Sequence, residues 1–333
     1  MSTSLLAALL LAGLARATKD WAFVREPDFL FTFGDSSISV AIHLASENWD
    51  WSNAPASSPL DEHQIATWCN GPVWARQFAD ARRRTKLINF AVPGATVDNA
   101  VVHNDWGVNV LDMQGQLSTF FAHEHEVAWH GNNSLFAFQF GANDIWFSLN
   151  STDVRVQTYA ALTDRMLSAL ERLRASGARA FALTTALPFD RARLAADAGN
   201  SVQTRLAERI TTFNAHMKSA MKEWCSAQDE VFCATVDTYS LASRIINNPT
   251  AYGFKEAIDF CWPYTGRFAG LQPDEYADPE CVGPVGEYLW RDKIHPSYAF
   301  HTLWAQLFRD TLEQQLSRDE LRIQRPARIR LRE

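Results

Sequence analysis

Short runs of apolar residues alternate along this chain with longer segments in which apolar residues recur at helical spacing. The short runs have the length of strands and are apolar at most positions; they cover residues 30–33, 87–92, 135–140, 180–185 and 230–236. Residues 154–175, 202–224 and 297–316 form the helical segments. This alternation predicts an α/β fold, built as a three-layer α/β/α sandwich around a central parallel sheet.

The first three predicted strands end close to residues that carry chemistry. In a parallel α/β sheet, ligands bind at the carboxyl ends of the strands. Ser36, Gly94 and Asn143 each lie just past one of these strand ends. We therefore expect these three residues to meet at one edge of the sheet and to form part of an active site.

Ser36 is the candidate nucleophile. It stands in the sequence Phe33-Gly34-Asp35-Ser36, where Gly34 permits the tight turn that lifts the next side chains out of the sheet. A serine hydroxyl is a poor nucleophile without a base, an orienting acid and an oxyanion hole. On its own, Ser36 fits better as the N-cap of a helix, so its interpretation as a nucleophile depends on partners elsewhere in the chain.

A candidate acid and base stand near the C-terminus, at Asp292 and His295. Residues three apart in one turn can face one another, so Asp292 can accept the Nδ1–H of His295 and leave Nε2 for the hydroxyl of Ser36. The position of His295 before Pro296 also fits a residue at a helix entry. Asp35 is expected to hold the turn and not to be the acid of the triad.

The candidate oxyanion hole has three donors: the backbone N–H of Ser36, the N–H of Gly94 and the side-chain amide of Asn143. Asn143 and Asp144 also fit a simple turn. In the catalytic interpretation, Asp144 anchors the loop that presents Asn143. If each motif had only its structural role, four unrelated motifs would stand in this order by coincidence, and one shared active site is the better explanation.

These blocks, Gly-Asp-Ser, Gly, Gly-x-Asn-Asp and Asp-x-x-His-Pro in that order, resemble the GDSL or SGNH hydrolase superfamily, and they extend from residue 29 to residue 296. The four signature residues of that superfamily map onto Ser36, Gly94, Asn143 and His295. The resemblance implies a flavodoxin-like sheet. The Phe-Gly-Asp-Ser start, the second block Asn-Phe-Ala-x-x-Gly-Ala and the many tryptophans look more specifically like secreted fungal acetylesterases of carbohydrate esterase family 16.

Two positions depart from the pattern of the superfamily. Ser37 follows the nucleophile, where an apolar or aromatic residue is usual, so a second hydroxyl stands at the same turn. Pro93 replaces the first of two glycines that are often adjacent in the second block, and proline has no N–H to donate. Only Gly94 is left to serve as the backbone donor there.

The first 17 residues are typical of a signal peptide. An apolar stretch from Leu5 to Leu14 precedes Ala15-Arg16-Ala17, which fits a cleavage site, and it is too short to cross a bilayer. A buried N-terminal helix is the alternative. We expect one hydrolase domain over residues 18–316 and a charged tail over 317–333, either a frayed helix end or disordered.

Charge and sequons fit an exported protein. Removal of residues 1–17 leaves 30 basic against 38 acidic residues, a balance that argues against nucleic acid and anionic membrane surfaces as partners. Asn132 and Asn150 each begin an N-glycosylation sequon. If they carry glycans, both must lie in surface loops.

The chain has five cysteines, so at least one thiol is unpaired. The sequence leaves the connectivity open. The economical pairing joins Cys225 to Cys233 and Cys261 to Cys281, because each pair closes a short loop; Cys69 is then the free and buried cysteine.

No metal and no organic cofactor is expected. The chain has no C-x-x-C or H-x-x-x-H spacing. Residues 123–130 hold three histidines, but those at i and i+2 fall on different faces of a helix. We interpret that run as a solvated helix end.

Tryptophans are frequent in two long insertions, residues 45–74 and 249–290. Flat aromatic rings near a catalytic strand end can stack on sugar rings, although packing in the core is the alternative for each of them. Trp146, three residues after Asn143, is the one that we expect to line the substrate cleft.

The combined prediction is a secreted, monomeric serine esterase that works through an acyl-enzyme. By resemblance, its substrates are short acyl esters, above all acetyl groups, on hemicellulose-derived saccharides. A lipase or phospholipase that cleaves longer acyl chains is the enzymatic alternative. A catalytically inactive carbohydrate-binding protein is the alternative from another class, and it would have no need of the triad.

Overall fold

The computed structural model describes residues 21–38, 67–105, 110–228, 230–265 and 278–324. Five parallel strands form one sheet in the order β2-β1-β3-β4-β5. The strands are β1 (Phe29–Gly34), β2 (Lys86–Asn89), β3 (Ser134–Gln139), β4 (Ala180–Thr184) and β5 (Phe232–Val236). This confirms the predicted parallel sheet and its flavodoxin-like strand order.

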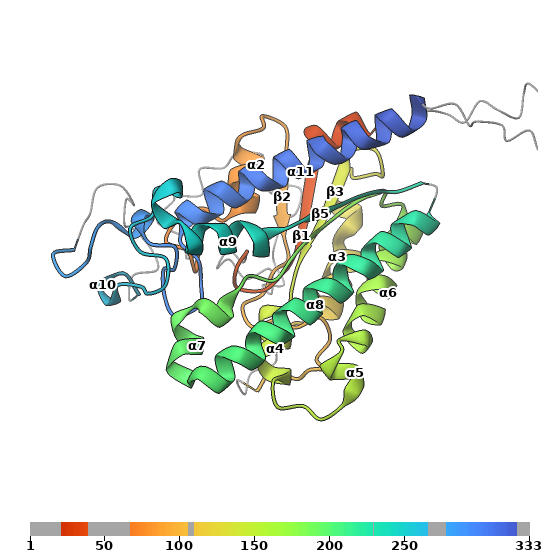
Figure 1. The fold of residues 1–333 in the computed structure, drawn as a ribbon. Helices are drawn as coiled ribbons and strands as arrows, with labels where there is room; N and C mark the ends of the chain where they lie inside the picture. The colour runs from red at the N-terminus through yellow and green to blue at the C-terminus, as the bar shows by residue number, and fades with distance from the viewer. Residues whose placement is uncertain (1–20, 39–66, 106–109, 229, 266–277, 325–333) are drawn as a thin grey trace, which may run out of the picture.

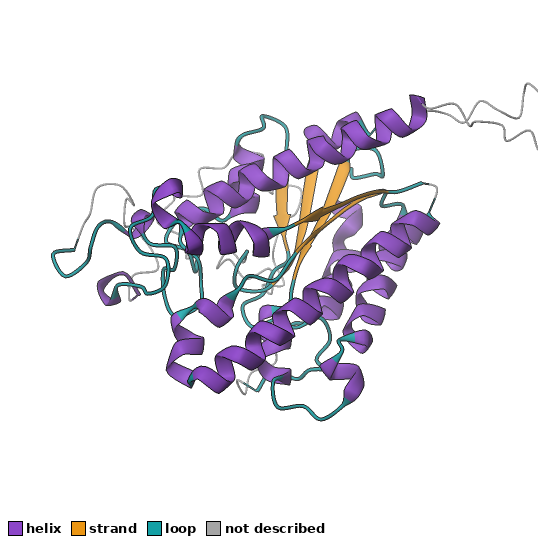
Figure 2. Cartoon of the chain, viewed as in Figure 1, coloured by secondary structure: helices purple, strands orange, loops and turns teal. Residues whose placement is uncertain are grey.

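Helices cover both faces of the sheet, which gives the three layers that the sequence predicts (Figures 1 and 2). One face carries α2 (Trp74–Asp80), α9 (Thr238–Asn247) and α11 (Tyr298–Gln324), and the other carries α3 (Met113–His123), α6 (Ala160–Ser176) and α8 (Asn200–Ala227). The shorter helices are α4 (Ala142–Ser148), α5 (Val154–Gln157), α7 (Arg193–Ala198) and α10 (Trp262–Thr265). Single 3-10 turns lie at Ala22–Arg25, Glu124–Glu126, Phe189–Arg191, Pro249–Tyr252 and Val285–Glu287.

Aromatic side chains fill the core on both sides of the sheet. On the α3 side, Phe31 meets Phe120 edge-on with ring centroids 5.2 Å apart. On the opposite side, Trp74 of α2 and Trp304 of α11 stack at 5.6 Å. Each such ring removes a large apolar area from water, worth about 1.5–3 kcal/mol when fully buried. This packing fixes α3 and α11 against the strands that carry the candidate site.

Two predicted helices differ from the observed ones. The segment 154–175 is not one helix, because Tyr159 has a left-handed backbone (φ +57°) that separates α5 from α6. Tyr159 is buried there, with its ring edge-on to Phe213 at 5.3 Å. The last helix continues past Leu316 to Gln324, since the residues that follow are mostly good helix formers.

The two disulfides of the structure are Cys225–Cys233 and Cys261–Cys281, and Cys69 is free and buried. Burial raises the pKa of the Cys69 thiol to about 12, so that it stays protonated at neutral pH. This arrangement agrees with the economical pairing expected from loop length.

Several predicted features lie outside the described residues. These are the signal peptide at 1–17, most of the tryptophan-rich insertion at 45–74, and the end of the charged tail at 325–333. Within the part of the chain that is described, no helix combines the length and apolarity needed to cross a bilayer.

Candidate active site

The turn after β1 is held in place by its neighbours on both sides. Gln116 of α3 is buried, accepts from the N–H of Gly34 and donates to its carbonyl, both at 2.9 Å. A Cβ on Gly34 would lie 2.6 Å from the carbonyl oxygen of Gln139, so only glycine fits this close approach to β3. The strand therefore ends in a rigid turn that presents the next residues at the edge of the sheet.

Asp35 and Ser36 occupy this turn. Oδ1 of Asp35 accepts the N–H of Ser37 at 2.9 Å, which forms an Asx turn around Ser36. Burial raises the pKa of Asp35 to about 6, although the hydrogen bonds from Ser37 oppose the rise. As the sequence predicts, Asp35 holds the turn.

Ser36, His295 and Asp292 form a continuous hydrogen-bonded chain. Nε2 of His295 lies 2.8 Å from Oγ of Ser36, and Nδ1 lies 2.9 Å from both carboxylate oxygens of Asp292. The three side chains are largely buried, with His295 15% and Asp292 16% exposed. Of the two neighbouring serine hydroxyls, that of Ser36 is the one in hydrogen-bond contact with the imidazole of His295.

The carboxylate of Asp292 is well stabilised as an anion. Its Oδ1 also accepts the backbone N–H groups of Ile294 at 3.0 Å and His295 at 2.8 Å. Burial alone would raise the pKa of Asp292, but the charge of His295 and these hydrogen bonds hold it well below its usual range. Asp292 is thus ionised at neutral pH and can orient and stabilise an imidazolium.

Trp68 stacks on the imidazole of His295, with ring centroids 4.8 Å apart and planes 28° apart. Trp68 belongs to the first tryptophan-rich insertion, but the sequence pattern points to Trp146 instead. Nothing in the local sequence links Trp68 to a histidine 227 positions later. Trp68 is therefore a residue of the site that sequence reasoning missed.

Hydrogen bonds join the second sequence block, which contains Gly94, to the third, which contains Asn143. Nδ2 of Asn143 donates to the carbonyl of Ala95 at 3.0 Å, and Oδ1 of Asp144 accepts the N–H of Val97 at 2.9 Å. Gly94 has a left-handed backbone (φ +84°), and its carbonyl accepts from the buried Asn104 at 2.6 Å. These contacts bring the loop of Gly94 next to the start of α4, which carries Asn143.

Asp144 is a buried carboxyl with a strongly perturbed pKa. Burial raises that pKa to about 7, the hydrogen bond from Val97 lowers it, and the nearby charge of Asp35 raises it further. Burial therefore makes this carboxyl easier to protonate than an ordinary aspartate. The expected loop is instead the start of helix α4, and the hydrogen bond from Val97 ties that helix to the segment after Gly94.

Other predicted residues take positions that fit their expectations to different degrees. Trp146 lies on α4 and packs, half-buried, against the main core. Asn132 and Asn150 are both exposed, as glycan acceptors must be. His123 pairs with Glu126 at 2.7 Å at the end of α3. Among the described residues, no group of three or more His, Cys, Asp or Glu side chains is placed to hold a metal ion.

Comparison with known proteins finds relatives that match this chain over most of its length. An acetylesterase of Thermothelomyces thermophilus is 24% identical over 322 residues, which cover 93% of this chain and 96% of that protein. A GDSL esterase/lipase of Arabidopsis thaliana is 25% identical over 293 residues, which cover 84% of this chain and 76% of that protein. Both relatives therefore span most of the described fold.

Among solved structures, the chain is similar to Axe2, an acetylxylan esterase from Geobacillus stearothermophilus. It has 13% sequence identity and a TM-score of 0.46, over 85% of this chain and 93% of that one. The profile of the GDSL-like lipase/acylhydrolase family matches residues 30–308, which include Ser36, Asn143 and His295. The chain belongs to this family and is a carboxylic ester hydrolase.

Proposed function

We propose that this protein is a secreted serine esterase that removes short acyl groups, above all acetyl, from hemicellulose-derived saccharides. The single observation that carries the mechanism is the chain of contacts from Ser36 through His295 to Asp292, at 2.8 and 2.9 Å. A nucleophile, a base and an orienting acid within hydrogen-bond reach are what acyl transfer by a serine requires.

In the first half of the reaction, Oγ of Ser36 attacks the carbonyl carbon of the ester while Nε2 of His295 takes its proton. Asp292 stabilises the imidazolium through Nδ1. Collapse of the tetrahedral intermediate breaks the bond to the sugar oxygen, which receives the proton from His295. The acyl group then stays on Ser36 and the free sugar hydroxyl leaves.

The tetrahedral oxyanion needs donors that are already in place. The candidates are the backbone N–H groups of Ser36 and Gly94 and the amide of Asn143. One N–H of the Asn143 amide donates to the carbonyl of Ala95, which fixes the plane of the amide. The second N–H is then left to donate to an oxygen of the substrate. The left-handed backbone of Gly94 supports the same interpretation, because it turns this loop sharply beside α4.

In the second half, His295 removes a proton from water, which attacks the acyl carbonyl. The acid leaves when His295 returns the proton to Oγ of Ser36, so the enzyme regains its starting state. None of these steps assigns a role to a cofactor.

The substrate class rests on the similarity to the acetylesterase of Thermothelomyces thermophilus over nearly the whole chain. Trp146 is proposed to line the substrate cleft, since it follows Asn143 on the same short helix. A lipase or phospholipase activity on longer acyl chains is the enzymatic alternative, because the Arabidopsis relative carries the name esterase/lipase.

Export is supported by the apolar segment of residues 1–17, by two disulfides and by the exposed sequon residues Asn132 and Asn150. We expect a monomer that acts on small-molecule or oligosaccharide esters and does not bind nucleic acid or membranes.

The test is acetate release from acetylated xylo-oligosaccharides by the mature protein, with 4-nitrophenyl esters from acetate to palmitate measured in parallel. Cleavage of the sugar acetates and of the shortest nitrophenyl esters supports the proposal. Cleavage of long-chain esters alone replaces it with the lipase alternative. Failure to cleave any ester, with binding to the oligosaccharides retained, would indicate a binding protein instead.

A further inference from the structure

Arg291 is a buried arginine next to the carboxylate of the triad. Its side chain is 2% exposed and belongs to the largest fully buried side chains of the described residues. A guanidinium in such a place is costly unless an anion and further acceptors surround it. The acceptors around Arg291 therefore indicate what it does.

Three segments of the chain supply those acceptors. Nη1 donates to Oδ2 of Asp292 at 2.8 Å, Nη2 to the carbonyl of Thr265 at 2.6 Å, and Nε to Oδ1 of Asn70 at 3.2 Å. The planar fork of a guanidinium can serve three acceptors at fixed angles, which a lysine ammonium on a flexible stem cannot do. Arg291 thus joins the triad acid to two other loops.

The first of these loops touches the imidazole directly. Asn70 stands two residues after Trp68, which stacks on His295. Asn70 has a left-handed backbone (φ +58°), and its Nδ2 donates to the carbonyl of Tyr264 at 3.2 Å. Through Asn70, Arg291 therefore holds the turn that carries Trp68.

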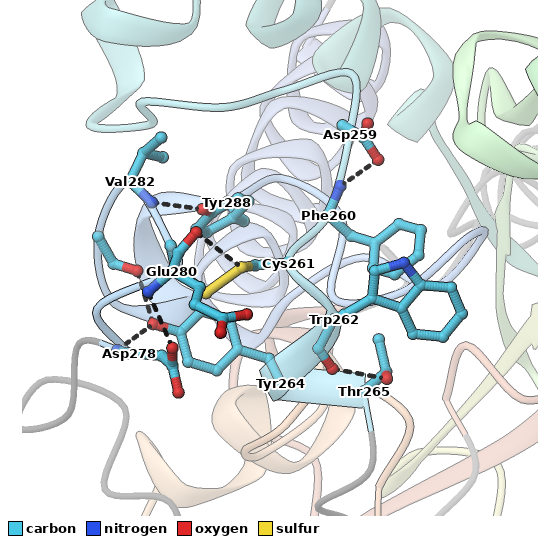
Figure 3. The surroundings of a disulfide bond; sticks show 12 residues. Asp259, Phe260, Cys261, Trp262, Tyr264, Thr265, Asp278, Glu280, Val282 and Tyr288 are labelled. Atoms are coloured by element: carbon cyan, nitrogen blue, oxygen red, sulfur yellow. Dashed lines mark hydrogen bonds between the residues drawn. A yellow bond between two sulfur atoms is a disulfide. The ribbon is translucent and has the colours of Figure 1, made fainter.

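The second loop is braced independently of Arg291. Figure 3 shows the disulfide Cys261–Cys281 beside α10, and the hydroxyl of Tyr264 donates to the carbonyl of Gly283 at 2.7 Å. The carbonyl of Thr265 at the end of α10 is thus offered to Arg291 from a fixed support.

The backbone of Arg291 shapes the triad turn as well. Its N–H donates to the carbonyl of His295 at 2.8 Å, and an antiparallel bridge joins Trp290 to Pro296 beside it. Both the backbone and the side chain of Arg291 therefore bear on the geometry between Asp292 and His295.

Oδ2 of Asp292 lies between a guanidinium and an imidazole, at 2.8 Å and 2.9 Å. The guanidinium therefore holds this carboxylate oxygen in a fixed position beside the imidazole.

We propose that Arg291 is a positioning residue, which fixes the Asp292 carboxylate and the Trp68 turn around His295. This inference rests on the proposed function, since it gives Arg291 a task only if Ser36 is activated by His295.

The experiment compares wild type with Arg291→Met, which removes the charge at similar length, and Arg291→Lys, which keeps the charge. The readouts are the rate of Ser36 labelling by a fluorophosphonate and the separate values of kcat and KM for 4-nitrophenyl acetate. Active enzyme is counted by the labelled fraction, so that losses through misfolding do not enter the rates.

For Arg291→Met, both rates are expected to fall about 10- to 100-fold, because even a small misplacement of groups in an active site slows the reaction by such a factor. The loss is expected in kcat, with KM nearly unchanged, because the variant disturbs the triad and not the binding of the small ester. Arg291→Lys is expected to recover only part of the rate, because a lysine keeps the charge but cannot serve three acceptors at fixed angles. Lys293→Met, which removes an exposed charge from the same loop, is the matched control and is expected to behave as wild type.

The outcomes separate the two proposals. If Arg291→Met is less stable but labels at the wild-type rate and keeps the wild-type kcat, Arg291 is merely structural and the inference is wrong. If Arg291→Met does not fold, Arg291→Lys decides, because a lysine that restores the full rate also contradicts the three-acceptor argument. If Ser36 of the wild type does not react at all, the proposed function and the inference fall together.

Discussion

The indole of Trp68 lies against the imidazole of His295, with ring centroids 4.8 Å apart, so one face of the proposed catalytic base is covered by a flat apolar surface. Such a contact limits rotation of the imidazole and excludes water from that face. We expect Trp68→Ala to lower kcat for 4-nitrophenyl acetate by about 10-fold and Trp68→Phe to recover most of the loss.

The matched control for Trp68 is Trp262→Ala, since Trp262 is 68% exposed. It is expected to leave kcat for the small nitrophenyl ester unchanged. An equal loss in both tryptophan variants would mean that the stacking on His295 has no particular effect.

Ser36 and Ser37 can be separated by paired substitutions. Ser36→Ala removes the hydroxyl 2.8 Å from Nε2 of His295 and is expected to lower kcat by about 10³-fold or more. Ser37→Ala keeps the backbone N–H that binds Asp35 and is expected to stay near wild type. Steady-state kinetics on acetyl esters measure both, and the reverse ranking would assign the nucleophile to Ser37.

Asp292→Asn tests the acid of the triad. An amide can keep the two backbone hydrogen bonds to Oδ1 but favours the wrong tautomer of His295 and cannot balance its charge, so kcat should fall by about 10³- to 10⁴-fold. Asp197→Asn is the control, because Asp197 forms an exposed ion pair with Lys293 in the adjacent loop. Activity of Asp292→Asn close to that of Asp197→Asn would exclude Asp292 from the mechanism.

Asp144 makes stability depend on pH. Its pKa is raised to about 7 in the folded protein and is near 3.8 when unfolded, so the folded state binds more protons between these values. The stability contributed by protonated Asp144 is therefore lost as pH rises through this window. Asp144→Asn keeps an acceptor for Val97 without this loss.

We expect the Tm difference between Asp144→Asn and wild type to become more positive from about pH 5 to about pH 8, by about 2 °C or more. Thermal unfolding at a series of pH values measures it. A difference that stays constant across this range would mean that Asp144 does not titrate in the folded protein as its burial implies.

The two disulfides should differ in what they protect. Replacement of either cysteine pair by serines is expected to lower the free energy of unfolding by about 2–3 kcal/mol, which is the contribution typical of disulfides that close loops of this length. Only loss of Cys261–Cys281 should also lower activity, since it braces the segment whose Thr265 accepts from Arg291. Cys225–Cys233 joins the end of α8 to the start of β5, away from the carboxyl ends of the strands. Chemical denaturation and esterase assays on both double variants separate these effects.

The sequence predicts the sheet and the triad because both depend on local patterns. Strands buried on both faces are apolar runs, and the Asp292–His295 contact lies within one turn. Their meeting with Ser36 follows from the rule that parallel strands present their carboxyl ends at one edge.

The partners that come from insertions are not predictable in this way. Trp68 contacts His295, and Arg291 contacts Asn70 and Thr265. These residues lie in loops or at loop ends, where no periodic sequence pattern predicts which residues meet. An arginine beside an aspartate in the sequence normally indicates a solvated surface. Arg291 is instead buried by segments that are distant from it in the sequence. The left-handed backbone of Tyr159 is a similar case, because tertiary packing overrides the helical pattern around it.

The hydrogen bond between Ser36 and His295 joins residues 259 positions apart in the sequence. A ribosome makes Ser36 early and His295 close to the end, so a nascent chain carries the proposed nucleophile long before the proposed base. Contacts of such wide separation form late, after much loop-closure entropy has been lost. With the proposed roles, hydrolysis begins only after this contact has formed, and ester cleavage then reports that the two ends of the domain have come together.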